Sequence, residues 1–420
     1  MRIIYTLLIY VAAPLVLIRL WWRARRQPEY LQHVGERFGY FGDSGATHVT
    51  HATTPMPLIW LHAVSVGETR AAEPLVHALR AHYPEHRILL THMTPTGRAA
   101  GEALFGSTVM RCYLPYDFPG AVARFLDYFR PSAGILMETE IWPNLVQVCQ
   151  ARATPLYLVN ARLSEKSFAR YQRVGTLSTD TLRALTAIAA QSADDARRFE
   201  ALGATSVAIT GNLKFDVAPS PVQRALGEHW RESFGARRVL LAASTREGEE
   251  LLFINHKLHA LPETLLVLVP RHPQRFDEVA AVLDQHHIRY QRRSANAPLH
   301  PDTRVLLGDS MGEMVAYYAA CDVAFIGGSL LPFGGQNLIE ACAVGKPVLI
   351  GPHTHNFAEA TERAVAAGAA VRVMDAADLQ RKAAALLDNP KVTERMSVAA
   401  LAFSGEHRGA TQKLLDLIRC

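Results

Sequence analysis

Short apolar runs alternate with helix-period segments along most of the chain, and this alternation limits the fold more than any other feature. The first series of apolar runs covers Leu58–Val64, Ile88–Met93, Val109–Leu114, Gly134–Glu138, Leu156–Asn160, Ala187–Gln191 and Val207–Thr210. A second series covers Val239–Ala243, Leu265–Pro270, Arg304–Leu307, Val323–Ile326 and Val348–Ile350. Strands that alternate with helices form parallel sheets covered on both faces. The sequence therefore predicts an α/β protein with two doubly wound domains facing each other across a cleft.

The predicted domain boundaries follow from the gap between the two series. Residues 212–237 are less periodic and contain Pro219, Pro221 and Gly227. We therefore expect an N-terminal segment at 1–26, a first Rossmann-like domain at 27–215 and a second at 216–420. The length of 420 residues and the 49% hydrophobic content suit two domains that each bury a core, and they exclude a disordered chain or a small disulfide scaffold.

The N-terminal segment has the character of a membrane anchor. Ile3–Ile18 is uncharged and mostly apolar, and arginines and paired tryptophans follow it at Arg19–Arg26. A cleaved signal peptide carries its positive charge before the apolar run, so we expect this segment to be retained. As a helix it is about 24 Å long, short of the ~30 Å hydrocarbon core, so both a span and an interfacial helix are open. The positive-inside rule predicts a catalytic body on the cytoplasmic side of the membrane.

Charge and cysteine usage narrow the class further. The net charge is +5, but residues 1–40 hold six arginines and two glutamates, so the other 380 residues carry about +1. A distributed nucleic-acid footprint is absent. The five cysteines show no CxxC spacing, which predicts buried thiols in a reducing compartment.

Carboxylates follow two strands of the first series. Glu68 comes soon after the first strand, where it could act as a general base or simply favour a helix N-terminus. Glu138 and Glu140 follow the fourth strand among apolar neighbours, where charge is costly unless it is paired or functional. Ligands of open parallel sheets bind beyond the carboxyl ends of the strands.

The second series has anion-suited strand ends. Arg271 and Arg275 follow one strand at the start of a helix, Gly308–Met314 follows the next, and Gly327–Ser329 with Gly334–Glu340 follows the third. Guanidinium groups and free backbone N–H groups bind phosphate, and glycines permit close approach of a ligand. Together these strand ends predict a nucleotide site.

Several other classes are disfavoured by motif. The chain has no Walker loop and no GxGxxG after its first strand, which argues against an ATPase or a dinucleotide dehydrogenase. His62, His92, His353 and His355 lack the spacing of a metal site. We therefore expect neither a metal nor a cofactor.

Specific motifs give the chain a family resemblance. They are His62–Glu68, Thr94–Gly97, Tyr113–Asp117, Met137–Asn144, Asn160–Ser164, Gly211–Asp216, Pro270–Pro273 and Gly334–Glu340. In this order they resemble the 3-deoxy-D-manno-octulosonic acid (Kdo) transferases of lipopolysaccharide synthesis. The resemblance covers the N-terminal segment and most of residues 58–357. The stretch from Gly42 to Pro57 is longer than the family pattern requires.

The resemblance implies a GT-B fold and an inverting transfer of Kdo from CMP-Kdo to lipid IVA, with CMP released. It implies no metal requirement and no nucleic-acid partner, and it places the enzyme at the inner membrane with its catalytic body in the cytoplasm. By motif, Glu68 is the general base, and Glu138 and Lys214 stabilise the transition state. The residues implied to bind CMP are Pro270, Arg271, Gly312, Glu313, Met314, Asn337 and Glu340. Glu140 could share the role of Glu138 or be structural.

Two alternatives stay open at this point. One is another GT-B nucleotide-sugar glycosyltransferase, or an epimerase of the same architecture, which would not need the anchor. The other is a membrane-associated nucleotide-binding protein without catalytic activity.

Overall fold

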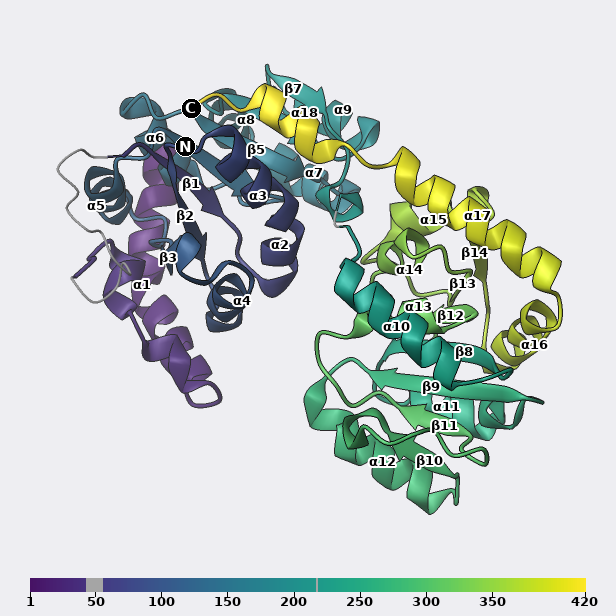
Figure 1. Ribbon diagram of the computed structural model, residues 1–420. Coiled ribbons are helices and arrows are strands. Elements are labelled where there is room, and N and C mark those ends of the chain that lie inside the picture. Colours follow the sequence, from purple (N-terminus) through teal and green to yellow (C-terminus); the bar gives the residue numbers. More distant parts are fainter. Residues whose placement is uncertain (43–55, 217) are drawn as a thin grey trace. The chain divides into compact units, whose positions relative to one another are not determined.

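The computed structural model describes residues 1–42, 56–216 and 218–420, and the chain forms two compact units (Figure 1). The first comprises Met1–Val217 together with Arg408–Cys420, and the second comprises Ala218–His407. This division differs from the expected boundary at one end, because the last residues pack with the first unit and not with the second. Most of the stretch Gly42–Pro57 lies outside the described residues.

The first unit is built on a seven-stranded parallel sheet in the order β3-β2-β1-β4-β5-β6-β7. Its strands are β1 (Leu58–His62), β2 (Arg87–His92), β3 (Met110–Tyr113), β4 (Ala133–Met137), β5 (Leu156–Ala161), β6 (Ala187–Ala190) and β7 (Val207–Ile209). The chain reverses direction across the sheet between β3 and β4, on either side of β1. This makes β1 and β4 the switch point, where ligands of such sheets bind.

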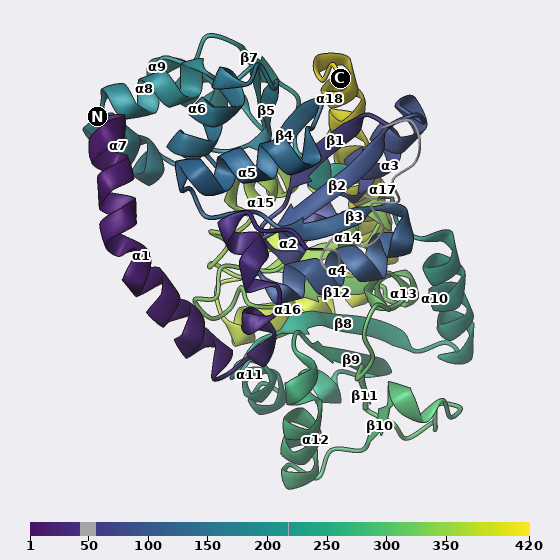
Figure 2. The same ribbon diagram turned by 90° about the vertical axis from the view of Figure 1, so that its left-hand side faces the viewer.

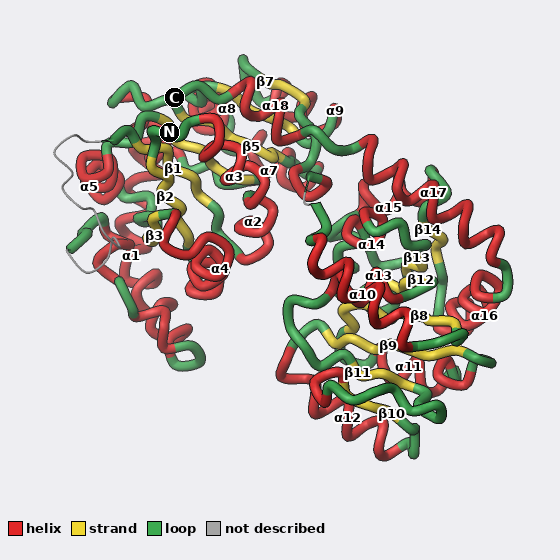
Figure 3. Tube along the Cα trace, in the orientation of Figure 1, coloured by secondary structure: helices red, strands yellow, loops and turns green. Residues whose placement is uncertain are grey.

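Helices cover both faces of this sheet (Figure 3). They are α1 (Arg2–Ala24), α2 (Val66–Ala71), α3 (Glu73–His82), α4 (Pro95–Phe105), α5 (Pro119–Phe129), α6 (Pro143–Ala151), α7 (Glu165–Arg173), α8 (Thr176–Arg183), α9 (Ala193–Ala201) and α18 (Ala410–Leu417), with 3-10 turns η1 (Pro28–Leu31), η2 (Val34–Phe38), η3 (Gly106–Thr108) and η4 (Leu213–Phe215). One apolar core lies on each face: Trp60, Phe125 and Leu145 belong to one, and Ile59, Leu75 and Leu414 to the other. Burial on both faces explains why the strands are continuously apolar.

The second unit repeats the plan with the parallel order β10-β11-β9-β8-β12-β13-β14. Its strands are β8 (Arg238–Thr245), β9 (Thr264–Pro270), β10 (Tyr290–Arg292), β11 (Val305–Leu307), β12 (Val323–Ile326), β13 (Val348–Ile350) and β14 (Ala370–Arg372). Its helices are α10 (Pro221–Ser233), α11 (Glu249–Asn255), α12 (Phe276–Gln285), α13 (Met314–Ala320), α14 (Ile339–Ala343), α15 (Ala358–Ala366), α16 (Ala376–Leu387) and α17 (Pro390–Glu406), with η5 (Leu258–Ala260), η6 (Pro273–Arg275) and η7 (Arg293–Ala295). The two-domain doubly wound α/β prediction is confirmed.

Two kinds of element escaped the sequence analysis. The edge strands β10 and β14 are three residues long and mostly half-exposed, so they lack the apolar run that marks a buried strand. Helix α10 lies within residues 212–237, which we expected to be irregular. It starts at Pro221, with Ser220 accepting a hydrogen bond from the Gln223 N–H, so the proline marks a helix start and not a break.

Helix α1 is long and apolar enough to cross a membrane, and only a small part of it is buried in the protein. It belongs to the first unit, where it runs along the outside (Figure 2) and its N-terminal end contacts α6. The expectation of an N-terminal apolar helix is confirmed.

Candidate functional site

Polar side chains gather at the carboxyl ends of five neighbouring strands in the first unit. Glu68 follows β1, Glu138 follows β4, Arg162 follows β5, Gln191 follows β6 and Lys214 follows β7. These strands are adjacent in the sheet order β1-β4-β5-β6-β7. Because the strands are parallel, these residues lie together at the carboxyl-terminal end of the sheet, here called the sheet edge, although they are up to 146 positions apart in the sequence.

Glu68 is held in the first turn of α2 by a variant of the capping box, in which its carboxylate bonds the residue before the N-cap Ser65. Its Oε1 accepts from the Ser65 hydroxyl at 3.0 Å and its Oε2 accepts from the Val64 N–H at 2.8 Å, while Ser65 Oγ accepts from the Glu68 N–H. Burial raises the pKa of Glu68 to about 7, and the negative charges of Glu138 and Glu140 add to that rise. A carboxyl group that exchanges its proton near neutral pH is suited to general-base chemistry.

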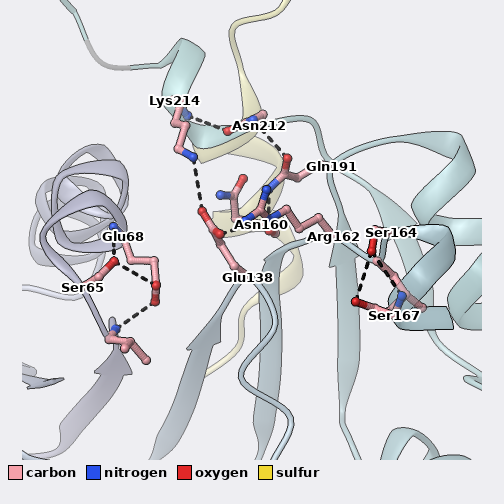
Figure 4. A network of polar contacts seen from close by, with 12 residues as sticks. Ser65, Glu68, Glu138, Asn160, Arg162, Ser164, Ser167, Gln191, Asn212 and Lys214 are labelled. Atoms are coloured by element: carbon pink, nitrogen blue, oxygen red, sulfur yellow. Dashed lines mark hydrogen bonds and ion pairs between the residues drawn. The ribbon is translucent and has the colours of Figure 1, made fainter. Parts of the chain in front are cut away.

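Glu138 lies between two cations. Its Oε1 is 3.4 Å from Lys214 Nζ and its Oε2 is 3.2 Å from Arg162 Nε (Figure 4). The residue is buried and has a φ of +55°, a left-handed backbone conformation that costs of order 1 kcal/mol for a non-glycine residue and is common at functional sites. Glu138 is therefore flanked by two positive charges, one on each carboxylate oxygen.

A chain of side-chain amides holds the loop that carries Lys214. Asn160 Oδ1 accepts from the Leu213 N–H at 3.1 Å, and its backbone carbonyl accepts from Gln191 Nε2 at 2.8 Å. Gln191 Oε1 in turn accepts from Asn212 Nδ2 at 3.0 Å, and Asn212 Oδ1 accepts from the Lys214 N–H (Figure 4). These bonds tie η4 to the ends of β5 and β6, so two strands hold the backbone at Lys214.

The structure separates the two carboxylates that follow β4. Glu138 is paired with Lys214 and Arg162, whereas Glu140 Oε2 accepts a hydrogen bond from Trp142 Nε1 at 2.8 Å. Burial raises the pKa of Glu140. Glu138 is thus the carboxylate bound to the cationic cluster, while Glu140 fastens the start of α6.

The histidines of the first sheet are core residues. His62 and His92 are fully buried, and burial lowers the pKa of His62 to about 3 and that of His92 to about 4. His62 Nδ1 contacts Thr91, and its ring packs edge-on against Trp142. Within residues 1–42, 56–216 and 218–420, no group of three His, Cys, Asp or Glu side chains is placed to hold a metal ion. Four of the five cysteines are buried free thiols, as expected, and Cys420 is exposed.

In the second unit, the predicted nucleotide residues lie at the ends of β9, β11 and β12. Pro270 is the buried last residue of β9, and Arg271 follows it with Nε 3.2 Å from Gln336 Oε1. This bond joins the end of β9 to the glycine-rich loop after β12. The sequence analysis named Arg271 but missed Gln336.

The segment after β11 is held by a second arginine. Glu313 Oε1 is 3.0 Å from Arg293 Nη2, and its Oε2 accepts from the Ser310 hydroxyl, which also contacts Tyr317. Gly312 has a φ of +79°, a conformation that favours glycine at this turn. Met314 then begins α13. Gly312, Glu313 and Met314 thus form one continuous turn at the end of β11.

The loop after β12 is shaped by a buried carboxylate that the sequence analysis missed. Glu249, which is fully buried at the start of α11, accepts from the N–H groups of Gly328, Leu330 and Arg246. Farther along, Asn337 Nδ2 donates to Glu340 Oε1 at 3.0 Å. A glutamate in the first turn after a glycine gives little sequence signal, because its partners are backbone groups 79 and 81 residues away.

The fold and these strand ends define a two-domain glycosyltransferase of the GT-B class. A family model of 3-deoxy-D-manno-octulosonic-acid transferases matches residues 32–217, and one of group 1 glycosyl transferases matches residues 283–402. A solved glycosyltransferase from Rickettsia africae has the same fold, with a TM-score of 0.59 and 12% identity over 87% of this chain and 98% of that one.

Relatives that match over nearly the whole chain identify the family within this class. The 3-deoxy-D-manno-octulosonic acid transferase of Bordetella pertussis is 45% identical over 99% of this chain and 98% of its own. That of Haemophilus influenzae is 38% identical over 100% and 98%. The chain belongs to the family of 3-deoxy-D-manno-octulosonic acid transferases. The prediction of a Kdo transferase is therefore confirmed. The two alternatives, an epimerase or other GT-B glycosyltransferase and a nucleotide-binding protein without catalytic activity, are not supported by these relatives.

Proposed function

We propose that this Kdo transferase moves Kdo from CMP-Kdo to lipid IVA with inversion at the anomeric carbon, using Glu68 as the general base. The observation that carries the proposal is the carboxyl of Glu68, whose pKa burial raises to about 7 at the switch point of the first sheet. An acceptor hydroxyl attacks the anomeric carbon, the bond from that carbon to the CMP phosphate oxygen breaks, and Glu68 takes the hydroxyl proton.

The cationic cluster around Glu138 suits the donor sugar. Kdo is a carboxylic acid, and Lys214 with the half-exposed Arg162 provides two positive charges against one carboxylate. In our proposal, Glu138 orients Lys214, and the positive charges of Lys214 and Arg162 stabilise the negative charge of the transition state. We also assign Arg162 to the stabilisation of the transition state, in addition to the residues that the resemblance implies, because its guanidinium pairs with Glu138 as Lys214 does.

The second unit supplies the nucleotide site of this proposal. The cytidine monophosphate group would be bound by Arg271, by the turn formed by Gly312, Glu313 and Met314, and by Asn337 and Glu340, with Pro270 fixing the end of β9. A guanidinium group such as that of Arg271 matches phosphate geometry. Its bond to Gln336 aligns it with the loop that carries Asn337.

The proposed location is the inner membrane, with the catalytic body on the cytoplasmic side. Helix α1 supplies the attachment, and the arginines at its end favour a surface of anionic lipids by about 1 kcal/mol each. The acceptor is itself a glycolipid, so attachment raises the concentration of enzyme near its substrate.

The test is a transfer assay with a defined product. The detergent-solubilised enzyme is incubated with CMP-Kdo and lipid IVA in the presence of EDTA, and the lipid is weighed by mass spectrometry. We expect mass increments of whole Kdo units from the wild type and none from Glu68→Gln. CMP should inhibit the reaction and UDP should not.

A matched variant separates chemistry from folding. Glu73→Gln, in the first turn of α3, removes a partly exposed carboxylate at a comparable helix position and should keep wild-type transfer. A lipid IVA mass that does not change with wild-type enzyme would contradict the proposed acceptor. Full transfer by Glu68→Gln would contradict the proposed base.

A further inference from the structure

Helix α1 has two different faces along its whole length. One stripe, at Tyr5, Ile9, Ala12, Ala13, Val16, Leu20 and Ala24, is partly or fully covered by the rest of the protein. The opposite stripe is exposed by 55–77% and holds Ile4, Leu8, Val11, Leu15, Ile18 and Trp22. Both stripes follow helical spacing, so they lie on opposite sides of the helix.

The N-terminal end of α1 is fastened to the first unit by polar contacts. Thr6 Oγ1 donates to Asn144 Oδ1 at 2.8 Å, and Arg2 Nη1 donates to Gln147 Oε1. The Tyr5 hydroxyl donates to Asp117 Oδ2 at 2.9 Å. Asp117 is buried and also accepts from the Asn144 and Leu145 N–H groups at the start of α6. This end of the helix therefore joins an existing buried hydrogen-bond network.

The C-terminal end of α1 is fastened to the same unit. Leu20 and Ala24 are buried, and the helix packs on η1, the turn that follows it. The next turn, η2, is anchored in the unit, because Arg37 Nη1 donates to the Met93 carbonyl and Glu36 pairs with Arg98 at 2.7 Å.

Attachment at both ends is incompatible with a helix that crosses the membrane. The 23 residues of α1 extend over about 34 Å at ~1.5 Å per residue, so a spanning helix would place Arg2 and Ala24 at opposite sides of the bilayer. We propose that α1 lies in the plane of the membrane, docked on the first unit, with its exposed apolar stripe inserted into one leaflet. The inference rests on the proposed attachment of the enzyme to a membrane.

The flanking residues fit an anionic lipid surface. Arg25 lies 3.8 Å over the ring of Trp21, and Arg26 lies 5.1 Å from the ring centre of Trp22. Tryptophan prefers the headgroup region and arginine binds lipid phosphate. A helix with one apolar face and cations beside it is typical of attachment to a single leaflet.

The docked position of α1 places the membrane surface near the proposed catalytic residues of the first unit. Tyr5 and Thr6 donate to Asp117 and Asn144, and Asn144, the second residue of α6, is six positions after Glu138. Docking of α1 therefore brings a lipid-facing surface to α6, the helix that follows the connection carrying Glu138. A glycolipid acceptor could then reach Glu68 and Glu138 without leaving the leaflet.

Depth measurements by fluorescence quenching test this inference. Single cysteines replace Ile4, Val11 and Ile18 in a Cys420→Ser background and are labelled with bimane. Ala13→Cys, on the covered stripe, is the matched control. The full-length protein is bound to phosphatidylethanolamine–phosphatidylglycerol vesicles that contain a shallow or a deep spin-labelled lipid, and attachment is checked by flotation. We expect the three exposed positions to be quenched within twofold of one another, mainly by the shallow label, and Ala13→Cys to be quenched at least threefold less.

Each other outcome has a defined meaning. Stronger quenching of Val11→Cys by the deep label, with Ile4→Cys and Ile18→Cys shallow, would show a spanning helix and overturn the inference. Equal quenching of Ala13→Cys and Val11→Cys would show that the helix is not docked. Failure to float would overturn the membrane attachment itself, and Kdo transfer in the same vesicles reports separately on the proposed reaction.

Discussion

Glu68 is both a helix-capping residue and the proposed base, and its protonation should therefore affect transfer and stability in opposite ways. Burial raises its pKa from 4.5 to about 7. The base works only when ionised, so transfer should rise as the pH increases through about 7. A pH profile of kcat/KM, which reports the pKa values of the free enzyme, measures this, and a flat profile between pH 5.5 and pH 8 would contradict it.

The same shift gives a stability prediction for Glu68→Gln. A carboxyl group whose folded-state pKa is raised contributes stability that is complete below its unfolded pKa and is lost as pH rises through the folded value. Relative to the variant, the wild type should lose about 2–3 kcal/mol of unfolding free energy between pH 4.5 and pH 8. Denaturant unfolding of both proteins at the two pH values measures the difference, and a constant difference would show that the pKa is not raised.

Lys214 should matter for transfer far more than for folding. Lys214→Ala leaves Glu138 with Arg162 as its cationic partner and removes one of the two positive charges at the sheet edge. Loss of one oriented charge of this kind typically slows a reaction about 10²–10³-fold. Lys166→Ala, an exposed lysine on α7, is the control and should keep full activity. A loss smaller than tenfold in Lys214→Ala would exclude a transition-state role.

At the scale of elements, two helical glycines of the second unit should respond oppositely to the same substitution. A Cβ at Gly227 in α10 would lie 2.2 Å from the Ala316 carbonyl oxygen in α13, whereas a Cβ at Gly405 in α17 meets nothing within 4 Å. Gly227→Ala should therefore destabilise the protein by about 1–3 kcal/mol by forcing α10 and α13 apart. Gly405→Ala should stabilise it by up to about 1 kcal/mol through helix propensity. Thermal unfolding compares the two, and equal effects would contradict this packing.

The elements also show how far the sequence predicts the structure. Buried strands such as β1 and β9 are visible as apolar runs because both faces of a parallel sheet are covered. The edge strands β10 and β14 lack that signal. Single residues at strand ends, such as Glu68 and Arg271, could be named from their position. The amide chain from Asn160 through Gln191 to Asn212 could not, because its bonds join residues 21 to 53 positions apart.

At the scale of the whole molecule, the last helix should stabilise the first unit although it follows the second in sequence. Ala410, Leu414 and Ile418 belong to the core that contains Leu213 and Leu75. The carboxylate of Asp216 accepts from the Gly409 and Thr411 N–H groups at 2.7 and 2.5 Å. The C-terminal helix α18 thus packs against η4, the turn that carries Lys214.

Leu414→Asp, in α18, should therefore destabilise elements of the first unit that are far from it in the sequence. A charge buried in this core is costly, so the variant should lose hydrogen-exchange protection in α3 and around η4, while α17 stays protected. Kdo transfer should also decrease, because α18 would no longer pack against η4 and support the backbone at Lys214. Val398→Asp, which is 64% exposed on α17, is the matched control and should leave exchange and transfer unchanged. Loss of protection in α17 with α3 intact would show that the last helix belongs to the second unit instead.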